Sequence, residues 1–529
     1  MDTTYKQEIK EKSREIIWNH AVSSLTDYRY KNQILNENYL KKLKEHIYAK
    51  TGYLISEQMF NDYLSFSCSI YGKKRPCDLN VAFFCGPEPE NDIRILQRLG
   101  VRLERMYAFE YDNKCFKTAV ESIEKGYPQV KIFNGKIEAF VESHNTSFDI
   151  IYLDFTSSLF EAFQTIGKIL DNNALSQLGV LIVNTTYSDI TDSSIDFLTK
   201  YFYYDIFFEN CVISGEENED TVAPSLTRSE GVWAEGLEDM DKFSEIIKSN
   251  FEYAYSAFQT DYINMYANIT KPYYAVLSNS ILKKRLIKEL TPQMTAALES
   301  IHENLDFQYA MSGDYLDTFK YNQVINSGLQ NWKDFYCKRQ NGIKYSRLEA
   351  MKIIEVIIRT AYLPDKFDDL PNRMVSNSHR TMQEILSPVL QEAILKIDHR
   401  IRKIPIGLFC DTPMIHLWIE MIINSLGYPY HCNVKNHIRH RYTAKTRPMC
   451  VDVFTLDQCR SFYDWLPMIE YHANFLEDLD RQLIVRLSLD AIGKQSLGII
   501  NKQYFGSALI GINEKKWALN SDFPNRLRL

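Results

Sequence analysis

A short loop that follows an apolar segment is the first part of the chain whose residue types suggest chemistry. Residues 80–90 read NVAFFCGPEPE and contain one glycine, Gly86. The next apolar segment ends in AFEYD, which places Glu110 24 positions after Gly86. A glycine lets a ligand approach the backbone, and a carboxylate about 20 residues further on is placed to accept hydrogen bonds from ribose hydroxyls. The spacing therefore predicts a nucleoside site that contains Gly86 and Glu110.

The same loop lacks the features that bind phosphate. The dinucleotide fingerprint GxGxxG and the Walker loop GxxxxGK[ST] both need further glycines, and the Walker loop also needs a lysine, whereas this chain has CGPEPEND. Glu88, Glu90 and Asp92 surround the start of the next helix, where the helix dipole would otherwise attract an anion. Three carboxylates repel a polyphosphate and suit a cationic ligand. S-adenosylmethionine, which has a sulfonium and an ammonium group and no phosphate, therefore fits better than ATP or NAD, and a nicotinamide enzyme is disfavoured.

Strand and helix signals alternate around this loop. Five apolar segments are predicted strands, and they span residues 79–85, 105–111, 129–135, 148–155 and 179–186. Apolar strands separated by helices predict a parallel sheet covered on both faces, with its ligand site at the carboxyl ends of the strands. The predicted fold class is α/β, a Rossmann-like doubly wound sheet with N-terminal helices, a helical middle region and a smaller mixed α+β C-terminal domain.

From about Leu79 to Asp189 the chain resembles the class I S-adenosylmethionine-dependent methyltransferases. The resemblance rests on the glycine-bearing loop after the first strand, the acidic end of the second, NG after the third and LDF after the fourth. It implies a cofactor site in which the first loop lines the methionine moiety, Glu110 holds the ribose and the third loop contacts the adenine. The implied cofactor-binding residues are Cys85, Gly86, Pro87, Glu88, Glu110, Tyr111, Asn134, Gly135 and Lys136.

Simpler interpretations of these residues stay open. Gly86 followed by Pro87 is also the pattern of a tight turn from a strand into a helix, because proline starts helices well. Glu110 is compatible with a solvated residue at a strand end. Cys85 has the residue type of a small buried side chain more often than that of a reactive thiol.

The acceptor side of a methyl transfer needs positioning more than strong acid or base catalysis, because the sulfonium already activates the methyl carbon. Asp154, at the end of the fourth strand, is the predicted catalytic residue, and it would take a proton or orient the acceptor. An equally open alternative is that Asp154 caps the next turn. Asn184 and Tyr187, after the fifth strand, are predicted to bind the acceptor. The segment YLDFTSS differs from the Asn/Asp-Pro-Pro-aromatic motif of amino-directed DNA enzymes, which disfavours methylation of adenine N6 or cytosine N4 in DNA.

A basic segment lies near the C-terminal end, at residues 431–447. Basic side chains interleaved with aromatic ones hold phosphates and stack on bases in single-stranded nucleic-acid sites, so this segment predicts contact with RNA or DNA. A solvated hairpin or a protein-docking surface is the alternative. The predicted contact residues are Lys435, Arg439, Arg441, Lys445 and Arg447. Cys432, His437, His440 and Cys450 are in principle zinc ligands, but their spacing does not fit a paired-cysteine site and nearby arginines oppose a cation, so no metal is predicted.

Length and composition limit these interpretations. A chain of 529 residues is too long for one core and predicts several domains. The predicted units are 1–70 (helical), 71–283 (Rossmann-like, with an acidic loop, a helical insertion and KPYYAVLSNS as a late strand), 284–402 (helical) and 403–529 (substrate recognition). The net charge of −7 gives no overall attraction to nucleic acid. Ten scattered cysteines and no apolar run near the roughly 20 residues that span a bilayer predict a cytoplasmic protein with no membrane contact.

These features predict an S-adenosylmethionine-dependent methyltransferase whose acceptor is RNA or DNA, held by the C-terminal region. The alternative is a catalytically inactive Rossmann-like module that acts through protein or nucleic-acid partners, bound by its helical and basic regions.

Overall fold

The computed structural model describes residues 8–51, 54–199, 240–282, 284–285, 424–444, 446–465 and 523–529. Three predicted features lie outside these residues: the acidic segment 214–238, nearly all of the helical region 284–402, and Lys445.

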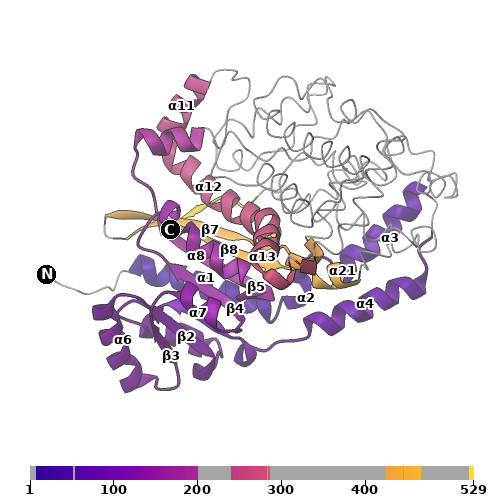
Figure 1. The fold of residues 1–529 in the computed structure, drawn as a ribbon, viewed down its shortest axis with the longest axis horizontal. Coiled ribbons are helices and arrows are strands. Elements are labelled where there is room, and N and C mark those ends of the chain that lie inside the picture. Colours follow the sequence, from indigo (N-terminus) through magenta and orange to yellow (C-terminus); the bar gives the residue numbers. More distant parts are fainter. Residues whose placement is uncertain are drawn as a thin grey trace, which may run out of the picture.

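One nine-stranded mixed sheet organises the described residues (Figure 1). Its strand order is β3-β2-β1-β4-β5-β8-β7-β9, and β6 pairs with β8 off this path. The strands are β1 (Val81–Phe84), β2 (Met106–Glu110), β3 (Lys131–Asn134), β4 (Phe148–Asp154), β5 (Leu175–Thr186), β6 (His431–Cys432), β7 (Ile438–Ala444), β8 (Arg447–Asp457) and β9 (Leu527–Arg528).

The first five strands are parallel, as the alternating signals predict. Helices connect them: α5 (Glu90–Arg98), α6 (Asn113–Gly126), α7 (Ile137–Ser143) and α8 (Leu159–Asp171). The strand order reverses between β1 and β4, because β2 and β3 lie on one side of β1 and β4 and β5 on the other. In open α/β sheets, ligands bind outside the carboxyl ends of the strands at such a reversal.

The two faces of the sheet carry separate apolar clusters, because successive side chains of a strand point to opposite faces. On one face, Phe83 of β1 and Tyr152 of β4 pack with Trp18 of the N-terminal helix. On the other face, Ala82 and Leu153 belong to the cluster formed with α7, α8 and α12 (Phe251–Met265). Both faces are therefore covered, which explains why the strands read as nearly continuous apolar runs.

The N-terminal helices include one that forms part of the sheet's covering layer. Helix α1 (Glu8–Leu25) contributes Ile17, Trp18 and Leu25 to the core. Three further helices follow it: α2 (Arg29–Asn32), α3 (Glu37–Thr51) and α4 (Glu57–Tyr71). In Figure 1, α3 and α4 lie at the opposite side of the view from β3 and α6.

The described strands within the predicted unit 403–529 continue the same sheet. Strand β8 pairs antiparallel with β5 from Leu178↔Asp457 to Thr186↔Met449, and β7 pairs antiparallel with β8. Residues 431–457 thus share one sheet with residues 81–186. A short C-terminal strand, β9, pairs parallel with β7. Helix α21 (Arg460–Trp465) follows β8.

The prediction that KPYYAVLSNS is a strand is wrong. Its first eight residues form helix α13 (Lys271–Ser278), which follows a π-helical turn (Tyr266–Thr270); helix α11 (Met240–Ser249) precedes α12. Helix α12, the π-helical turn and α13 follow one another without a break, and Pro272, which has no N–H to donate, lies next to the π-helical turn, where the hydrogen-bond pattern of the helix already changes. The buried Lys271 ammonium donates to the carbonyl of Tyr428 and to Asn173, which fixes the start of this helix.

The fold class predicted from sequence is confirmed in its main feature. The order β3-β2-β1-β4-β5 is that of a Rossmann-like doubly wound sheet, and antiparallel strands β8 and β7 follow it. Within the described residues, no helix is long and apolar enough to cross a membrane.

Candidate functional site

The glycine loop after β1 has the backbone conformation of a close-approach turn. Gly86 has φ +57°, in the left-handed region that favours glycine, and a Cβ built on it would meet nothing within 4 Å. Before it, the backbone N–H of Cys85 donates to the carbonyl of Phe109, which ties the loop to β2. Burial raises the pKa of the Cys85 thiol, so this cysteine is a packed, unreactive side chain.

Glu110 lies beside this loop at the end of the neighbouring strand. The register pairs Phe84 with Phe109, so the residues that follow them, Cys85 and Glu110, continue adjacent strand ends. The Glu110 carboxylate accepts a hydrogen bond of 2.8 Å from the backbone N–H of Asp112, which orients it. Gly86 and Glu110 therefore lie at the carboxyl ends of the neighbouring strands β1 and β2.

The third loop completes the same edge of the sheet. Glu110 pairs with Asn134, and the N–H of Gly135 (φ +141°) donates to the Glu110 carbonyl at 2.9 Å. The side chains of Asn134, Lys136 and Tyr111 are exposed, and Tyr111 is 70% exposed. The residues predicted for ribose and adenine thus share one solvent-facing edge.

The expected ring of three carboxylates around the loop is partly wrong. Asp92 is buried on the α1 side, where it accepts a hydrogen bond of 2.8 Å from Trp18 Nε1 and lies 3.4 Å from Arg14 Nε. Burial raises the pKa of Asp92, and the Arg14 guanidinium opposes that rise. Glu90 binds Ser122 of α6. Only Glu88, of these three carboxylates, stays beside the glycine loop, where it accepts from Asn91.

Asp154 belongs to a compact polar cluster at the ends of β4 and β5. Its Oδ2 lies 3.0 Å from Lys10 Nζ of α1, and its Oδ1 accepts a hydrogen bond of 2.6 Å from Asn184 Nδ2. Asn184 Nδ2 also donates to the hydroxyl of Tyr442 at 2.9 Å. The predicted pair Asp154 and Asn184 is therefore in direct contact, and the structure adds Lys10 and Tyr442, which sequence reasoning missed.

A signal for the missed residues is present in the N-terminal helix. Lys10, Arg14 and Trp18 are spaced four apart, which places them on one face of α1. That face packs against the sheet and directs the three side chains at Asp154, Asp92 and Tyr152, respectively.

Tyr187 lies apart from the Asp154 cluster. Its ring packs with the cluster on the α12 face, 5.4 Å from the ring of Tyr255. Asn184, in contrast, hydrogen bonds to Tyr442, which belongs to the cluster on the α1 face. The two residues predicted to bind the acceptor are thus directed to different faces of the sheet.

One basic residue of this segment, Arg439, is buried, which corrects the prediction that it contacts nucleic acid. The Arg439 Nε donates to the carbonyl of Pro524 at 2.6 Å, and its Nη1 donates to Thr260 Oγ1 at 3.2 Å. A phosphate has no access to it. Arg441 donates to the Tyr253 hydroxyl at 3.1 Å and lies 3.6 Å from a Glu252 carboxylate oxygen.

Two described members of the basic segment keep the exposure that nucleic-acid contact requires. Lys435 and Arg447 are exposed, whereas Lys445 lies outside the described residues. Contact with RNA or DNA stays a prediction that rests on this reduced set.

The four residues weighed as zinc ligands do not converge. His437 Nε2 bonds to Asp452 and its ring packs on Phe454, whereas His440 Nε2 bonds to Ser13 of α1. The two imidazoles are thus held by partners in different layers. Within the described residues, no group of three or more His, Cys, Asp or Glu side chains is arranged to hold a metal ion.

Comparison with known proteins gives one structural match to report. No family model matches the chain, and no curated protein matches it significantly. A solved structure, the SAH-bound methyltransferase PaMTH1 of Podospora anserina, is 14% identical in sequence. The match covers 42% of this chain and 84% of that chain, with a TM-score of 0.19.

Proposed function

We propose that the chain binds S-adenosylmethionine at the carboxyl ends of β1, β2 and β3 and transfers its methyl group to an acceptor beside Asp154. One observation carries this proposal: Gly86 and Glu110 follow the paired ends of β1 and β2, and β1 lies at the reversal of strand order. The open space at Gly86, where a Cβ would meet no atom within 4 Å, suits a ligand that lies against the backbone.

Residues after β1, β2 and β3 would bind the cofactor, and Asp154 at the end of β4 would position the acceptor. Glu110 would accept the ribose hydroxyls, and the loops at Gly86 and Gly135 would hold the methionine and adenine ends. Bound S-adenosylmethionine supplies an electrophilic methyl carbon. Asp154, already oriented by Asn184, would position the acceptor, which is the main requirement for an in-line displacement.

Glu110→Ala should weaken binding of S-adenosylmethionine and S-adenosylhomocysteine about 10- to 100-fold, because hydrogen bonds to a charged group contribute about 1.5–3 kcal/mol. Isothermal titration calorimetry measures this directly. Glu104→Ala is the matched control, since Glu104 is an exposed glutamate at the other end of β2. No binding of either ligand to the unaltered protein would favour the inactive module. Retained affinity in Glu110→Ala would remove Glu110 from the site.

Gly86→Ala should lower both stability and cofactor affinity, and the chain offers a close control. Gly72 shares a φ of +57° and the same open space around a built Cβ, but it ends α4. Each substitution should lower the free energy of unfolding by about 1 kcal/mol, the cost of left-handed backbone in an L-residue. Only Gly86→Ala should weaken cofactor binding, by about tenfold, because only there does the new methyl group occupy ligand space. Equal affinities in the two variants would place the ligand elsewhere.

A further inference from the structure

Lys10 of the chain itself contacts Asp154, the residue proposed to position the methyl acceptor. Lys10 Nζ lies 3.0 Å from Asp154 Oδ2, and the side chains of Lys10 and Asp154 are 19% and 14% exposed. A pair this enclosed differs from a solvated surface ion pair, because each charge has lost much of its water. The Asp154 carboxylate therefore already binds one kind of group, the ammonium at the end of an unbranched aliphatic side chain.

A second hydrogen-bond acceptor lies next to the same carboxylate. Asn184 is fully buried, and its Oδ1 has no hydrogen-bond partner among the described residues. The contact with Asp154 decides the orientation of the Asn184 amide, in which Nδ2 donates to Asp154 Oδ1 at 2.6 Å. The reversed amide would place Asn184 Oδ1 against this carboxylate oxygen, and neither atom could donate. A buried acceptor without a donor costs about 1–3 kcal/mol, so a ligand that brings an N–H to it gains this energy.

The charges around Asp154 decide which ligands can replace Lys10. Arg14 is committed to Asp92, whose carboxylate is fully buried on the same side of α1. Without Lys10, the largely enclosed Asp154 carboxylate would have no cation within ion-pair distance among the described residues. A cation restores the balance, whereas a neutral hydroxyl does not, and a phosphate adds a repulsion.

We propose that the methyl acceptor is a primary alkyl amine, the chemistry of a lysine side chain, which displaces Lys10 and donates to Asp154 and to Asn184 Oδ1. This inference rests on the proposed function. The ammonium first releases one proton to solvent. The nitrogen lone pair then forms a bond to the methyl carbon as the carbon–sulfur bond breaks and its electron pair stays on sulfur. The products are a secondary methylammonium, S-adenosylhomocysteine and the released proton.

Binding of a labelled peptide tests this proposal without depending on turnover. The probe is a fluorescein-labelled pentapeptide with one central lysine between glycines, and its counterpart has norleucine, which keeps the aliphatic arm and removes the charge. Fluorescence anisotropy with the full chain and saturating S-adenosylhomocysteine should show at least tenfold tighter binding of the lysine peptide. Equal binding of the two peptides overturns the proposal.

Substitution of the competing lysine sharpens the result. Lys10→Met should tighten binding of the lysine peptide about tenfold, because the internal competitor is gone. Lys12→Met, which changes an exposed lysine of the same helix, should leave the affinity as it was. Asp154→Asn should abolish the preference for lysine while S-adenosylhomocysteine affinity, measured separately, stays unchanged. An unaltered lysine affinity in both Lys10→Met and Asp154→Asn would show that the Lys10–Asp154 pair is only structural.

Transfer of a labelled methyl group from S-adenosylmethionine gives the final readout. Label on the peptide lysine, or on Lys10 itself by peptide mass mapping, supports an amine acceptor. Label on an RNA or DNA oligonucleotide and on no amine overturns it and supports the nucleic-acid prediction. Failure to bind S-adenosylhomocysteine at all would instead reject the proposed function, and the calorimetric titration distinguishes these two failures.

Discussion

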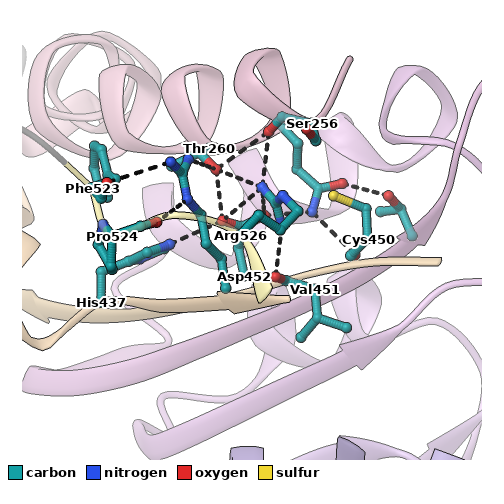
Figure 2. A network of polar contacts seen from close by, with 12 residues as sticks. Ser256, Thr260, His437, Cys450, Val451, Asp452, Phe523, Pro524 and Arg526 are labelled. Atoms are coloured by element: carbon teal, nitrogen blue, oxygen red, sulfur yellow. Dashed lines mark hydrogen bonds and ion pairs between the residues drawn. The ribbon is translucent and has the colours of Figure 1, made fainter. Parts of the chain in front are cut away.

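Arg526→Ala should lower the free energy of unfolding by about 3–5 kcal/mol, the usual cost of breaking a buried ion pair by removing one partner. The Arg526 side chain is 2% exposed, and its Nη2 lies 3.0 Å from Asp452 Oδ2, which is fully buried. The same guanidinium donates to the carbonyls of Val451 and Ser256 (Figure 2). Its removal leaves a buried carboxylate short of its countercharge and two carbonyls short of a donor.

The neighbouring strand provides the control for this prediction. Arg528 lies in β9, two positions after Arg526, and unlike Arg526 it is exposed. Arg528→Ala should change the free energy of unfolding by less than about 0.5 kcal/mol. Urea unfolding of both variants measures the difference. A loss below 1 kcal/mol in Arg526→Ala would show that the remaining donors to Asp452, which include Thr260 at 2.7 Å and Gln259 at 2.8 Å, hold the site without it.

The parallel part of the sheet could be predicted from the sequence because its signals are local. Each strand is a short apolar run, and a helix begins within a few residues of its end. One such start is marked by Asp112, whose carboxylate caps α6. The carboxyl ends of parallel strands lie at one edge, so Gly86, Glu110 and Asp154 could be assigned to the same edge of the sheet from the sequence.

The C-terminal hairpin could not be placed in this way because its partners are distant in sequence. Arg439 looks like a surface residue when its neighbours are read alone. It becomes buried because Thr260 of α12 and the backbone of Pro524, 85 positions away, satisfy its donors. A basic run predicts exposure only when no such partners exist elsewhere in the chain.

Asp92 shows the same limit within the candidate site. Its position at the start of α5 predicts an anion near the glycine loop, but α1 brings Arg14 and Trp18 against it. The register of α1 on the sheet depends on tertiary packing, and the spacing of Lys10, Arg14 and Trp18 indicates only that they share a face. Which carboxylate each one meets is decided by the assembled sheet.

His437→Gln should make the protein less sensitive to acid. Burial lowers the pKa of His437 from 6.5 to about 4, although Asp452 opposes the shift. Between these values the unfolded chain binds a proton that the folded chain excludes, so this histidine's contribution to stability falls as the pH drops from 6.5 to 4. A difference of about 2.5 pKa units corresponds to roughly 3 kcal/mol. Glutamine removes the titration but keeps an N–H that can donate to Asp452.

The experiment must compare variant with parent, because other groups titrate in the same range. Burial also lowers the pKa of His431 to about 3 and that of His440 to about 4, which adds to the acid loss. Burial raises the pKa of Asp171 to about 6, which acts in the opposite direction, since the folded chain then binds the extra proton. These contributions are common to both proteins and cancel in the difference.

Urea unfolding at pH 7.5 and pH 4.5 isolates the contribution of His437. The parent should lose about 2–3 kcal/mol more than His437→Gln between these two pH values. At pH 7.5 the variant should be less stable, because glutamine packs less well against Phe454 and Phe523 than the imidazole does. At pH 4.5 the difference in the free energy of unfolding between parent and variant should become smaller or change sign. Parallel losses in the two proteins would mean that His437 accepts its proton equally well in the folded chain. That outcome requires solvent to reach an imidazole that is now buried against Phe454 and Phe523.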